Sequence, residues 1–137
     1  MVDRDTLARL ALFADLGGPQ LEALAHDLDE ERFAAGTRVL RQGLSGENFY
    51  VILDGTASIR VDGQQRALLH AGEFFGEVSI LAGEAASADV VAAGEELRCA
   101  VLAGSELRSL LLSYPPVAVR MLEMGARRLR AANEWQP

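Results

Sequence analysis

The sequence predicts a mainly β fold, a sandwich or small barrel of short strands, with α-helices at both ends. Between residues 33 and 102 the chain consists of short apolar runs such as TRVL, FYVIL and RALLHA, which glycines separate at regular intervals. Asp-Gly pairs lie between some of these runs, and apolar residues recur at helical spacing before and after the region. Many short strands joined by such turns are typical of sandwiches and small barrels. A chain of 137 residues suits one domain, which buries about two thirds of its unfolded surface.

The N-terminal region, residues 1–30, is predicted to form helices. Its apolar residues recur at helical spacing on either side of a break at Gly17 and Gly18. Pro19 suits the first turn of the second helix, where a missing backbone N–H leaves no helical hydrogen bond unmade. The apolar residues on which this prediction rests are Leu7, Leu10, Leu21, Leu24, Ala25 and Leu28.

The strand region, residues 31–103, contains two expected hairpin turns. Asp54-Gly55 and Asp62-Gly63 each lie between apolar runs. Glycine supplies the positive φ that a two-residue hairpin turn needs. Each pair is therefore predicted to join two antiparallel strands.

The C-terminal region, residues 104–132, is predicted to form two helices. Ser105 is placed to cap the segment ELRSLLL. Pro115 and Pro116 then end that helix or begin the next one, which is expected over residues 117–132.

The second of these helices has an apolar stripe, with four arginines as more polar neighbours. The stripe packs either on the protein's own strands or on the same helix of a second copy, because apolar stripes of this kind also form dimer seams. A homodimer through residues 117–132 is therefore one of two expectations. Trp135, beyond this helix, is expected to be a loose aromatic or an anchor against the body. The stripe consists of Val117, Met121, Leu122, Met124 and Leu129.

The charge and the apolar runs of the sequence argue against nucleic acid and a membrane as direct partners. The formal net charge is −7, and residues 1–119 carry nine arginines against eighteen carboxylates. Such an acidic body lacks the basic footprint of a DNA- or RNA-binding surface, and the four arginines near the C-terminus are more typical of a solvated helix face. No apolar run approaches the roughly 20 residues that cross a bilayer, and the N-terminal segment MVDRDTLARL is charged where a signal peptide would be apolar. We expect a cytoplasmic protein.

Residues with catalytic or metal-binding potential are few. His26 and His70 are far apart in the sequence, and neither lies in a metal-binding or catalytic motif. His70 is expected at the surface or half-buried on a strand. Cys99 is the single cysteine of the chain, and its setting in LRCAVL favours a buried thiol on a strand over a reactive one. We therefore expect neither enzymatic activity nor a metal site.

Three segments, RQG, ENFYVILDG and GEFFGEVSIL, occur in this order between the two helical regions. In this arrangement they resemble the cyclic-nucleotide-binding domain, a family that includes catabolite activator proteins, cyclic-nucleotide-dependent kinases and gated channels. The resemblance covers nearly the whole chain and implies one regulatory domain over residues 1–137. It implies a double-stranded β-helix, or jelly-roll β-roll, of about eight strands flanked by N-terminal and C-terminal helices. Residues 72–91 would form the phosphate-binding cassette, which receives cyclic AMP or cyclic GMP as a regulatory ligand, and no other cofactor is implied.

The first half of the implied cassette is intact. It comprises Phe75, Gly76, Glu77, Val78 and Ser79. The resemblance implies that Gly76 allows close approach of the backbone and that Glu77 accepts a hydrogen bond from the ribose 2′-hydroxyl. The residues alone leave two other interpretations open: Glu77 as a first-turn carboxylate favoured by the helix dipole, and Ser79 as a turn-forming residue instead of a ligand contact.

The second half of the implied cassette departs from the family pattern, which is roughly Arg-Ser/Thr-Ala-x-Val. The matching residues are ASADV, so Ser87, Ala88 and Val90 fit, whereas Ala86 occupies the position of the phosphate-binding arginine. Residues 67–97 contain no arginine and six carboxylates. The cassette therefore keeps its ribose carboxylate and its backbone donors but lacks the charge that pairs with the phosphate.

Three hypotheses about function follow. In the first, the domain is a degenerate member that binds cyclic nucleotide weakly or not at all and acts in interaction or dimerisation. In the second, it still senses cyclic AMP or cyclic GMP through backbone amides, Ser87 and an arginine from elsewhere in the fold, with Arg38, Arg41 and Arg128 as candidates. In the third, the less positive pocket receives another, neutral small molecule. In each case the chain is either a stand-alone module or a part of a longer protein that carries an effector.

Overall fold

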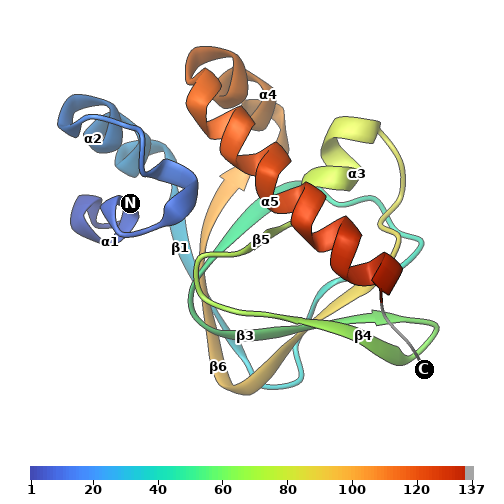
Figure 1. Ribbon diagram of the computed structural model, residues 1–137. Helices are drawn as coiled ribbons and strands as arrows, with labels where there is room; N and C mark the ends of the chain where they lie inside the picture. Colours follow the sequence, from blue (N-terminus) through green and yellow to red (C-terminus); the bar gives the residue numbers. More distant parts are fainter. Residues whose placement is uncertain (135–137) are drawn as a thin grey trace.

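The computed structural model describes residues 1–134, which form a β-roll with helices before and after it (Figure 1). At the N-terminus lie α1 (Arg4–Ala8), the short 3-10 helix η1 (Ala11–Phe13) and α2 (Gly18–Asp27). The strands are β1 (Asp29–Ala34), β2 (Arg38–Leu40), β3 (Asn48–Val61), β4 (Gln64–Leu69), β5 (Phe74–Phe75) and β6 (Asp89–Ala103), with helix α3 (Glu77–Ala82) between β5 and β6. Two helices follow, α4 (Gly104–Ser113) and α5 (Pro115–Glu134).

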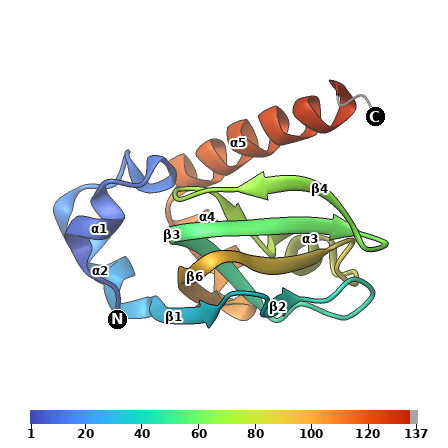
Figure 2. The ribbon, with the colours of Figure 1, turned by 90° about the horizontal axis from the view of Figure 1, so that it is seen from below.

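The strands of the described residues form one antiparallel sheet of six strands, which curls into the roll. The order is β1-β6-β3-β4, with β2 also paired with β6 and β5 also paired with β3. Figure 2 shows β3 and β6 side by side through the middle of the roll, with β4 on one side of this pair and β1 and β2 on the other. The predicted β-roll with flanking N-terminal and C-terminal helices is therefore confirmed.

Two of the strands are long, so the described residues contain fewer separate strands than the eight that the resemblance implies. β3 has 14 residues and β6 has 15. The predicted hairpin at Asp54-Gly55 is wrong, because the chain continues through both residues within β3, and the register against β6 shifts between Ile52 and Thr56. Gly55 has φ +92°, and a Cβ at this position would overlap the carbonyl oxygen of Glu96. The positive φ of this glycine therefore serves a bulge between two close strands instead of a turn.

The second predicted hairpin, at Asp62-Gly63, is confirmed. These residues join β3 to β4, whose ends Val61 and Gln64 are register partners. Asp62 has φ +52° and Gly63 has φ +80°, which is the left-handed backbone that a two-residue turn of this kind requires at both positions. Aspartate adopts this backbone more readily than most other residues that have a Cβ.

Two apolar clusters form the core, one on each face of β3. Alternate residues of a strand point to opposite faces, so Phe74 joins the cluster beneath the helices whereas Phe75 joins the cluster inside the roll. Cys99 is fully buried in the roll, and burial raises the pKa of its thiol to about 12, in agreement with the predicted buried thiol on a strand. The helix-side cluster also includes Phe13, Phe49, Leu107, Val117 and Met121, and the roll-side cluster also includes Tyr50, Ile52, Leu69 and Leu97.

The starts of the two C-terminal helices differ in part from the prediction. α4 begins at Gly104, so Ser105 lies inside its first turn, and Ala103 at the cap position makes no side-chain hydrogen bond. The prediction that Ser105 caps this helix is therefore wrong. Glycine is needed at position 104, because a Cβ there would lie 2.6 Å from the carbonyl oxygen of Glu47. Pro115 begins α5 instead of ending α4, as suits a residue without a backbone N–H.

Helix α5 lies across the roll (Figures 1 and 2). It carries both buried and exposed apolar residues. Val117 and Met121 are buried, and Met124 packs against the same cluster. Leu122 and Leu129, which belong to the predicted stripe, are 73% and 63% exposed. The predicted stripe thus divides into an inner side, which packs on the protein's own core, and an outer side, which faces away from it.

The lengths and hydropathy of the helices can be compared with those of membrane-spanning helices. Among residues 1–134, none combines the length and the hydropathy that a membrane-spanning helix requires. The 20-residue helix α5 carries four arginines. Trp135, predicted to be a loose aromatic or an anchor, lies outside the described residues.

Candidate functional site

The turn between β5 and α3 forms the first half of the predicted cassette. Phe75 is buried inside the roll, where its ring stacks on that of Tyr50 with the centroids 4.8 Å apart. Gly76 then turns the chain into α3 with φ +93°. A Cβ at Gly76 would lie 2.6 Å from the carbonyl oxygen of Asn48 on β3. Both the backbone angle and the neighbouring strand therefore exclude a side chain at this position.

The carboxylate of Glu77 is the charged group that this turn buries. Its side chain is only 14% exposed, and its Oε1 lies 3.6 Å from Nη1 of Arg128 in α5. The other oxygen, Oε2, is buried and has no hydrogen-bond partner among the described residues. Burial raises the pKa of this carboxyl group, an effect that its backbone hydrogen bond and the charge of Arg128 oppose. Glu77 thus holds one buried acceptor oxygen whose hydrogen-bonding capacity is unused among the described residues.

Arg128 connects α5 to the cassette through an ion pair, a hydrogen bond and a cation–π contact. Besides its ion pair with Glu77, its Nη2 donates a 2.7 Å hydrogen bond to the carbonyl oxygen of Phe74. Its guanidinium also lies over the ring of Phe74, 4.9 Å from the centroid, which is cation–π geometry. Its Nε is buried and has no hydrogen-bond partner within residues 1–134. One side chain therefore links the last helix to the cassette.

The sequence contains a pattern that distinguishes Arg128 from the other two candidate arginines, Arg38 and Arg41. Val117, Met121, Met124 and Arg128 recur at intervals of four, three and four, which is the spacing of one helix face. An arginine that continues an apolar face is expected to be buried and partnered. This pattern selects Arg128 ahead of the other two candidates.

The loop after α3 is held against the loop between β2 and β3. The buried hydroxyl of Ser79 donates a 2.6 Å hydrogen bond to the carbonyl oxygen of Glu84 and accepts one of 3.1 Å from the backbone N–H of Gly46. The backbone of Ala86 forms two hydrogen bonds of 2.9 Å with the backbone of residues 43–44. The fold itself thus uses the hydroxyl of Ser79, as the turn-forming interpretation predicts.

The other cassette residues lie in different environments. Ala86 is buried, with 9% exposure, and Ala88 is half-buried. Val78 and Ser87 are exposed. Because an alanine side chain is a single methyl group, the position that the family pattern gives to a phosphate-binding arginine supplies no polar atom beyond its backbone.

Arg38 lies close to the second half of the cassette, but its charge is partnered. Its Nε is 3.7 Å from Oδ2 of Asp89 at the start of β6. Oδ1 of Asp89 accepts a 2.7 Å hydrogen bond from the backbone N–H of Gln42. Asp89 therefore joins β6 to the β2–β3 loop and is the ion-pair partner of Arg38.

Arg41, like Arg38, is exposed and lines a cavity of about 260 Å³, but it differs from Arg38 in having no acidic partner among residues 1–134. Leu44 and Tyr50 also line this cavity, as does Gly46. The cavity adjoins the cassette, since the backbone N–H of Gly46 donates to Ser79. Arg41 is thus the candidate arginine beside this cavity whose charge is unpaired among the described residues.

The two histidines are exposed and lie away from the cassette turn. His26 is in the last turn of α2, and His70 follows β4, as the surface position predicted for His70 requires. Within residues 1–134, no group of three or more His, Cys, Asp and Glu side chains is placed to hold a metal ion.

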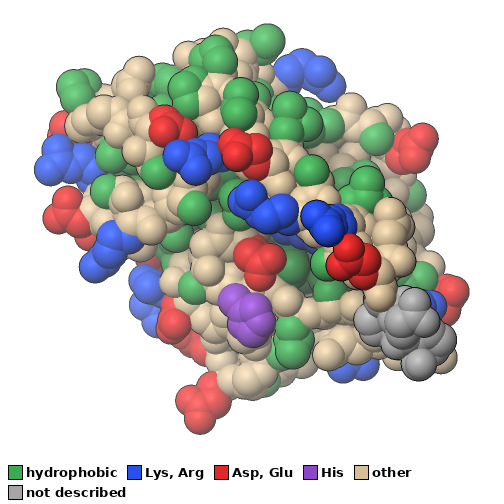
Figure 3. Space-filling view, in the orientation of Figure 1, with side chains coloured by type: hydrophobic (Ala, Val, Ile, Leu, Met, Phe, Trp, Pro, Cys, Tyr) green, Lys and Arg blue, Asp and Glu red, His purple; other side chains and the backbone are tan. Residues whose placement is uncertain are grey.

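The surface over the C-terminal helices mixes apolar and charged side chains. Figure 3 shows basic side chains over α5 with acidic ones close by, and apolar side chains grouped over α4 and the first half of α5. This face therefore lacks the continuous basic stripe that is typical of nucleic-acid binding.

Comparisons with known proteins agree with this architecture. In Mus musculus, the cyclic nucleotide-gated channel alpha-4 is 31% identical over 142 residues, which cover 97% of this chain and 24% of the channel. The catabolite activator protein of Thermus thermophilus superposes with a TM-score of 0.75 and 30% identity, over 89% of this chain and 59% of that one. The regulatory subunit of a cAMP-independent protein kinase A from Trypanosoma brucei superposes with a TM-score of 0.76 and 25% identity, over 90% and 44%. The chain thus spans less than two thirds of each of these relatives.

The family model for the cyclic nucleotide-binding domain matches residues 30–114. This match begins in β1, ends just after α4 and includes both halves of the cassette. The β-roll, the turn through Gly76 and this match together show that the chain belongs to the cyclic nucleotide-binding domain family.

Proposed function

We propose that this chain is a regulatory, non-catalytic domain whose pocket accepts the ribose of a cyclic nucleotide but holds the phosphate weakly, so that its affinity for cyclic AMP and cyclic GMP is low. The observation behind the proposal is Ala86, a buried methyl group where the family pattern has arginine. Glu77 keeps an unpartnered, buried acceptor oxygen, which binding would have to expose to the ribose hydroxyl. The last helix, fastened to the cassette by Arg128, is the element through which occupancy would be transmitted.

The missing charge is expected to lower affinity strongly. A hydrogen bond to a charged group contributes about 1.5 to 3 kcal/mol. Truncating one partner of a buried ion pair costs roughly 2 to 5 kcal/mol. These values correspond to a loss of about tenfold to several thousandfold, which would turn a micromolar site into a millimolar one.

Two of the three other candidate arginines are already paired with carboxylates and do not supply this charge. Arg128 pairs with Glu77, so the two groups neutralise one another. Arg38 pairs with Asp89. Arg41 has no acidic partner within residues 1–134. The hypothesis that the domain still senses a cyclic nucleotide therefore depends on Arg41.

One relative supports the idea that the roll persists without a response to cyclic AMP. The Trypanosoma brucei protein is described as the regulatory subunit of a cAMP-independent protein kinase A. A conserved roll is thus compatible with loss of control by this ligand. For the present chain, the same loss would follow from the alanine at position 86.

Isothermal titration of the purified chain with cyclic AMP and cyclic GMP, beside the Ala86→Arg variant, tests the proposal. We expect weak or undetectable binding by the unmodified chain and binding at least about tenfold tighter by the variant. Tight binding by the unmodified chain would contradict the proposal, and loss of that binding in Arg41→Gln would then locate the charge. Silence from both proteins would show a reshaped pocket and favour another, neutral ligand.

A second function, homodimerisation through α5, is favoured by the outer side of this helix. Val119, Leu122 and Leu129 are 55%, 73% and 63% exposed, and the exposed Ala126 lies between the two leucines. Their spacing of three, four and three is that of the a and d positions of a coiled-coil seam. Because the inner side of α5 already packs on the roll, the outer side is the part that a second copy would cover. A seam between two copies of one helix is self-complementary, as a two-fold interface requires.

A further inference from the structure

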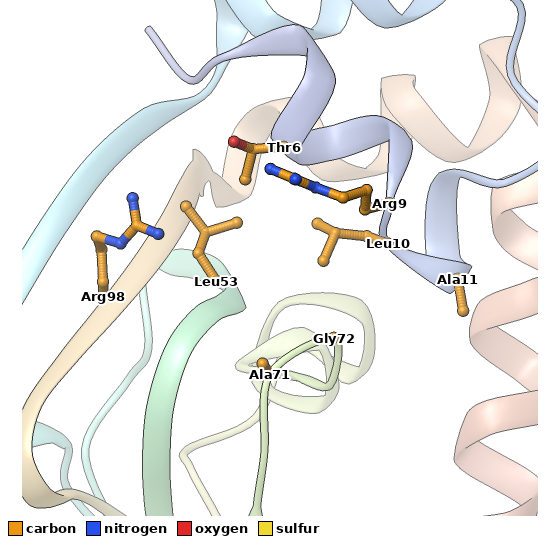
Figure 4. A pocket seen from close by; sticks show the side chains of 8 residues that line it. All are labelled: Thr6, Arg9, Leu10, Ala11, Leu53, Ala71, Gly72 and Arg98. Atoms are coloured by element: carbon orange, nitrogen blue, oxygen red, sulfur yellow. The ribbon is translucent and has the colours of Figure 1, made fainter.

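A second cavity lies between the N-terminal helices and the turn that precedes β5 (Figure 4). Its volume is about 460 Å³, which is within the range of small-molecule sites. Residues from α1 and η1 form one wall, and residues from β3, β6 and the Ala71-Gly72 turn form the others. Of the predicted cassette, residues 72–91, Gly72 at its first position lines the cavity, and none of the residues given a ligand-binding role does.

Two arginines line this cavity, and they differ in whether an acidic side chain pairs with them. Arg98 is partnered, because its Nη1 lies 3.2 Å from Oε1 of Glu30. The guanidinium of Arg9 has neither an ion pair nor a hydrogen bond among residues 1–134. Figure 4 shows the side chain of Arg9 extended from the end of α1 back toward Thr6, with Arg98 on the far side of Leu53. In a chain with a net charge of −7, Arg9 is a free cation at the edge of a cavity.

The floor of the cavity is apolar and fixed. Leu10 and the half-buried Leu53 line it, and both belong to or pack against the helix-side core cluster. The turn beside them is held to the roll, since the backbone N–H of Gly72 donates a 2.8 Å hydrogen bond to the carbonyl oxygen of Ile52. The walls are therefore preformed, and a ligand would not need to order a loop.

We propose that this cavity binds a small organic anion with an apolar body. Arginine binds a carboxylate through two parallel hydrogen bonds, and the guanidinium of Arg9 is unpartnered and accessible for this. The apolar body of the same ligand would cover Leu10 and Leu53, which line the cavity beside Arg9. An inorganic anion would use the charge and leave the apolar floor uncovered, and a neutral apolar molecule would leave Arg9 without a partner. A ligand with both parts matches both features of the cavity.

Titration of the ¹⁵N-labelled chain with 3-phenylpropanoate, followed by ¹H–¹⁵N correlation spectra, tests this site. We expect shifts confined to the residues that line the cavity, namely those at positions 6, 9–11, 53, 71–72 and 98, with little change around Gly76. The neutral 3-phenylpropanamide, and the Arg9→Gln variant with the carboxylate, should each bind about tenfold more weakly. Arg4→Gln is the matched control, because Arg4 begins the helix that Arg9 directly follows, is exposed and does not line the cavity. It should bind the carboxylate as the unmodified chain does.

Three outcomes would overturn the proposal. The first is the absence of shifts up to about 10 mM carboxylate. The second is equal binding of the carboxylate and the amide, which would mean that the charge is not recognised. The third is equal weakening by Arg9→Gln and Arg4→Gln, which would mean that the effect is a general change of surface charge. The spectra of the variants show at the same time whether each is folded, and the result is independent of nucleotide binding at the cassette.

Discussion

The side chains of Glu77 and Arg128 form the ion pair at the cassette turn. Their closest atoms are 3.6 Å apart, so they attract one another without forming a short hydrogen bond. Oε2 of Glu77 and Nε of Arg128 are buried without hydrogen-bond partners among the described residues. Each such atom costs about 1 to 3 kcal/mol. A ligand hydroxyl that donates to Oε2 would therefore recover part of this cost, which is the physical reason to expect ribose recognition here.

The raised pKa of Glu77 predicts a specific dependence of stability on pH. Since burial raises the native pKa above its usual value of 4.5, the native state holds the proton more readily than the unfolded state does. The stability from this group is complete below pH 4.5 and is lost as pH rises through the native pKa. In Glu77→Gln the group does not titrate, so the free energy of unfolding of the variant minus that of the unmodified chain should increase as pH rises above 4.5.

Urea denaturation of both proteins over a series of pH values measures this difference. A constant difference would mean that the native pKa of Glu77 equals its unfolded value. A difference that decreases with pH would mean that the attraction of Arg128 outweighs burial. Either result would contradict the expected direction.

Gly76 and Gly72 form a matched pair for testing close backbone approach. Both have φ +93°, but a Cβ at Gly76 would lie 2.6 Å from the carbonyl oxygen of Asn48, whereas nothing lies within 4 Å of one at Gly72. Gly72→Ala should therefore cost only the left-handed backbone, about 1 to 2 kcal/mol. Gly76→Ala should cost about 1 to 3 kcal/mol more, because the strand or the turn must move. Chemical denaturation measures both, and equal costs would show that the cassette turn yields without resistance.

At the scale of elements, features that follow from regular residue spacing are predicted correctly from the sequence, whereas features that depend on tertiary contacts are not. The roll, its flanking helices and the Asp62-Gly63 turn follow from local patterns. The sequence does not distinguish Gly55 from a turn glycine, because its role depends on the backbone of β6 opposite it. Similarly, Ser105 looks like a cap, but the chain becomes helical at Gly104, where only glycine fits against the loop before β3.

In the cassette, too, local features can be predicted from the sequence, whereas long-range contacts cannot. Its turn through Gly76 is predictable from a glycine between an apolar pair and a short helical segment. The pairing of Glu77 with Arg128 joins residues that are far apart in the sequence. Only the spacing of the inner face of α5 points to it. The predicted apolar stripe of α5 also combined two faces, which only the packing against the roll separates.

The outer side of α5 makes a prediction about oligomeric state. Leu122→Glu should reduce association by about tenfold or more, because it places a charge in each copy of the proposed seam. Leu112→Glu is the control, since Leu112 is 77% exposed but lies on α4. Sedimentation equilibrium measures both. A monomeric unmodified chain, or equal effects of the two substitutions, would contradict a dimer through α5.

At the scale of the whole molecule, α5 connects the N-terminal segment with the cassette. Near its start, Nε of Arg120 donates a 2.9 Å hydrogen bond to Oδ2 of Asp15, and this contact lowers the pKa of Asp15. Further along, Arg128 contacts Glu77 and Phe74. A displacement of the cassette would therefore reach the N-terminal helices through one rigid helix. The same helices form a wall of the second cavity, so both proposed sites adjoin elements that α5 holds together.

The measurement that tests the central claim most directly separates charge from size at position 86. Cyclic AMP is titrated into the unmodified chain, Ala86→Arg and Ala86→Gln, where the last adds a long polar side chain without charge. We predict that Ala86→Arg binds at least about tenfold more tightly than both of the others. Equal affinity of the arginine and glutamine variants, or tight binding by the unmodified chain, would contradict the claim that a missing positive charge weakens this pocket.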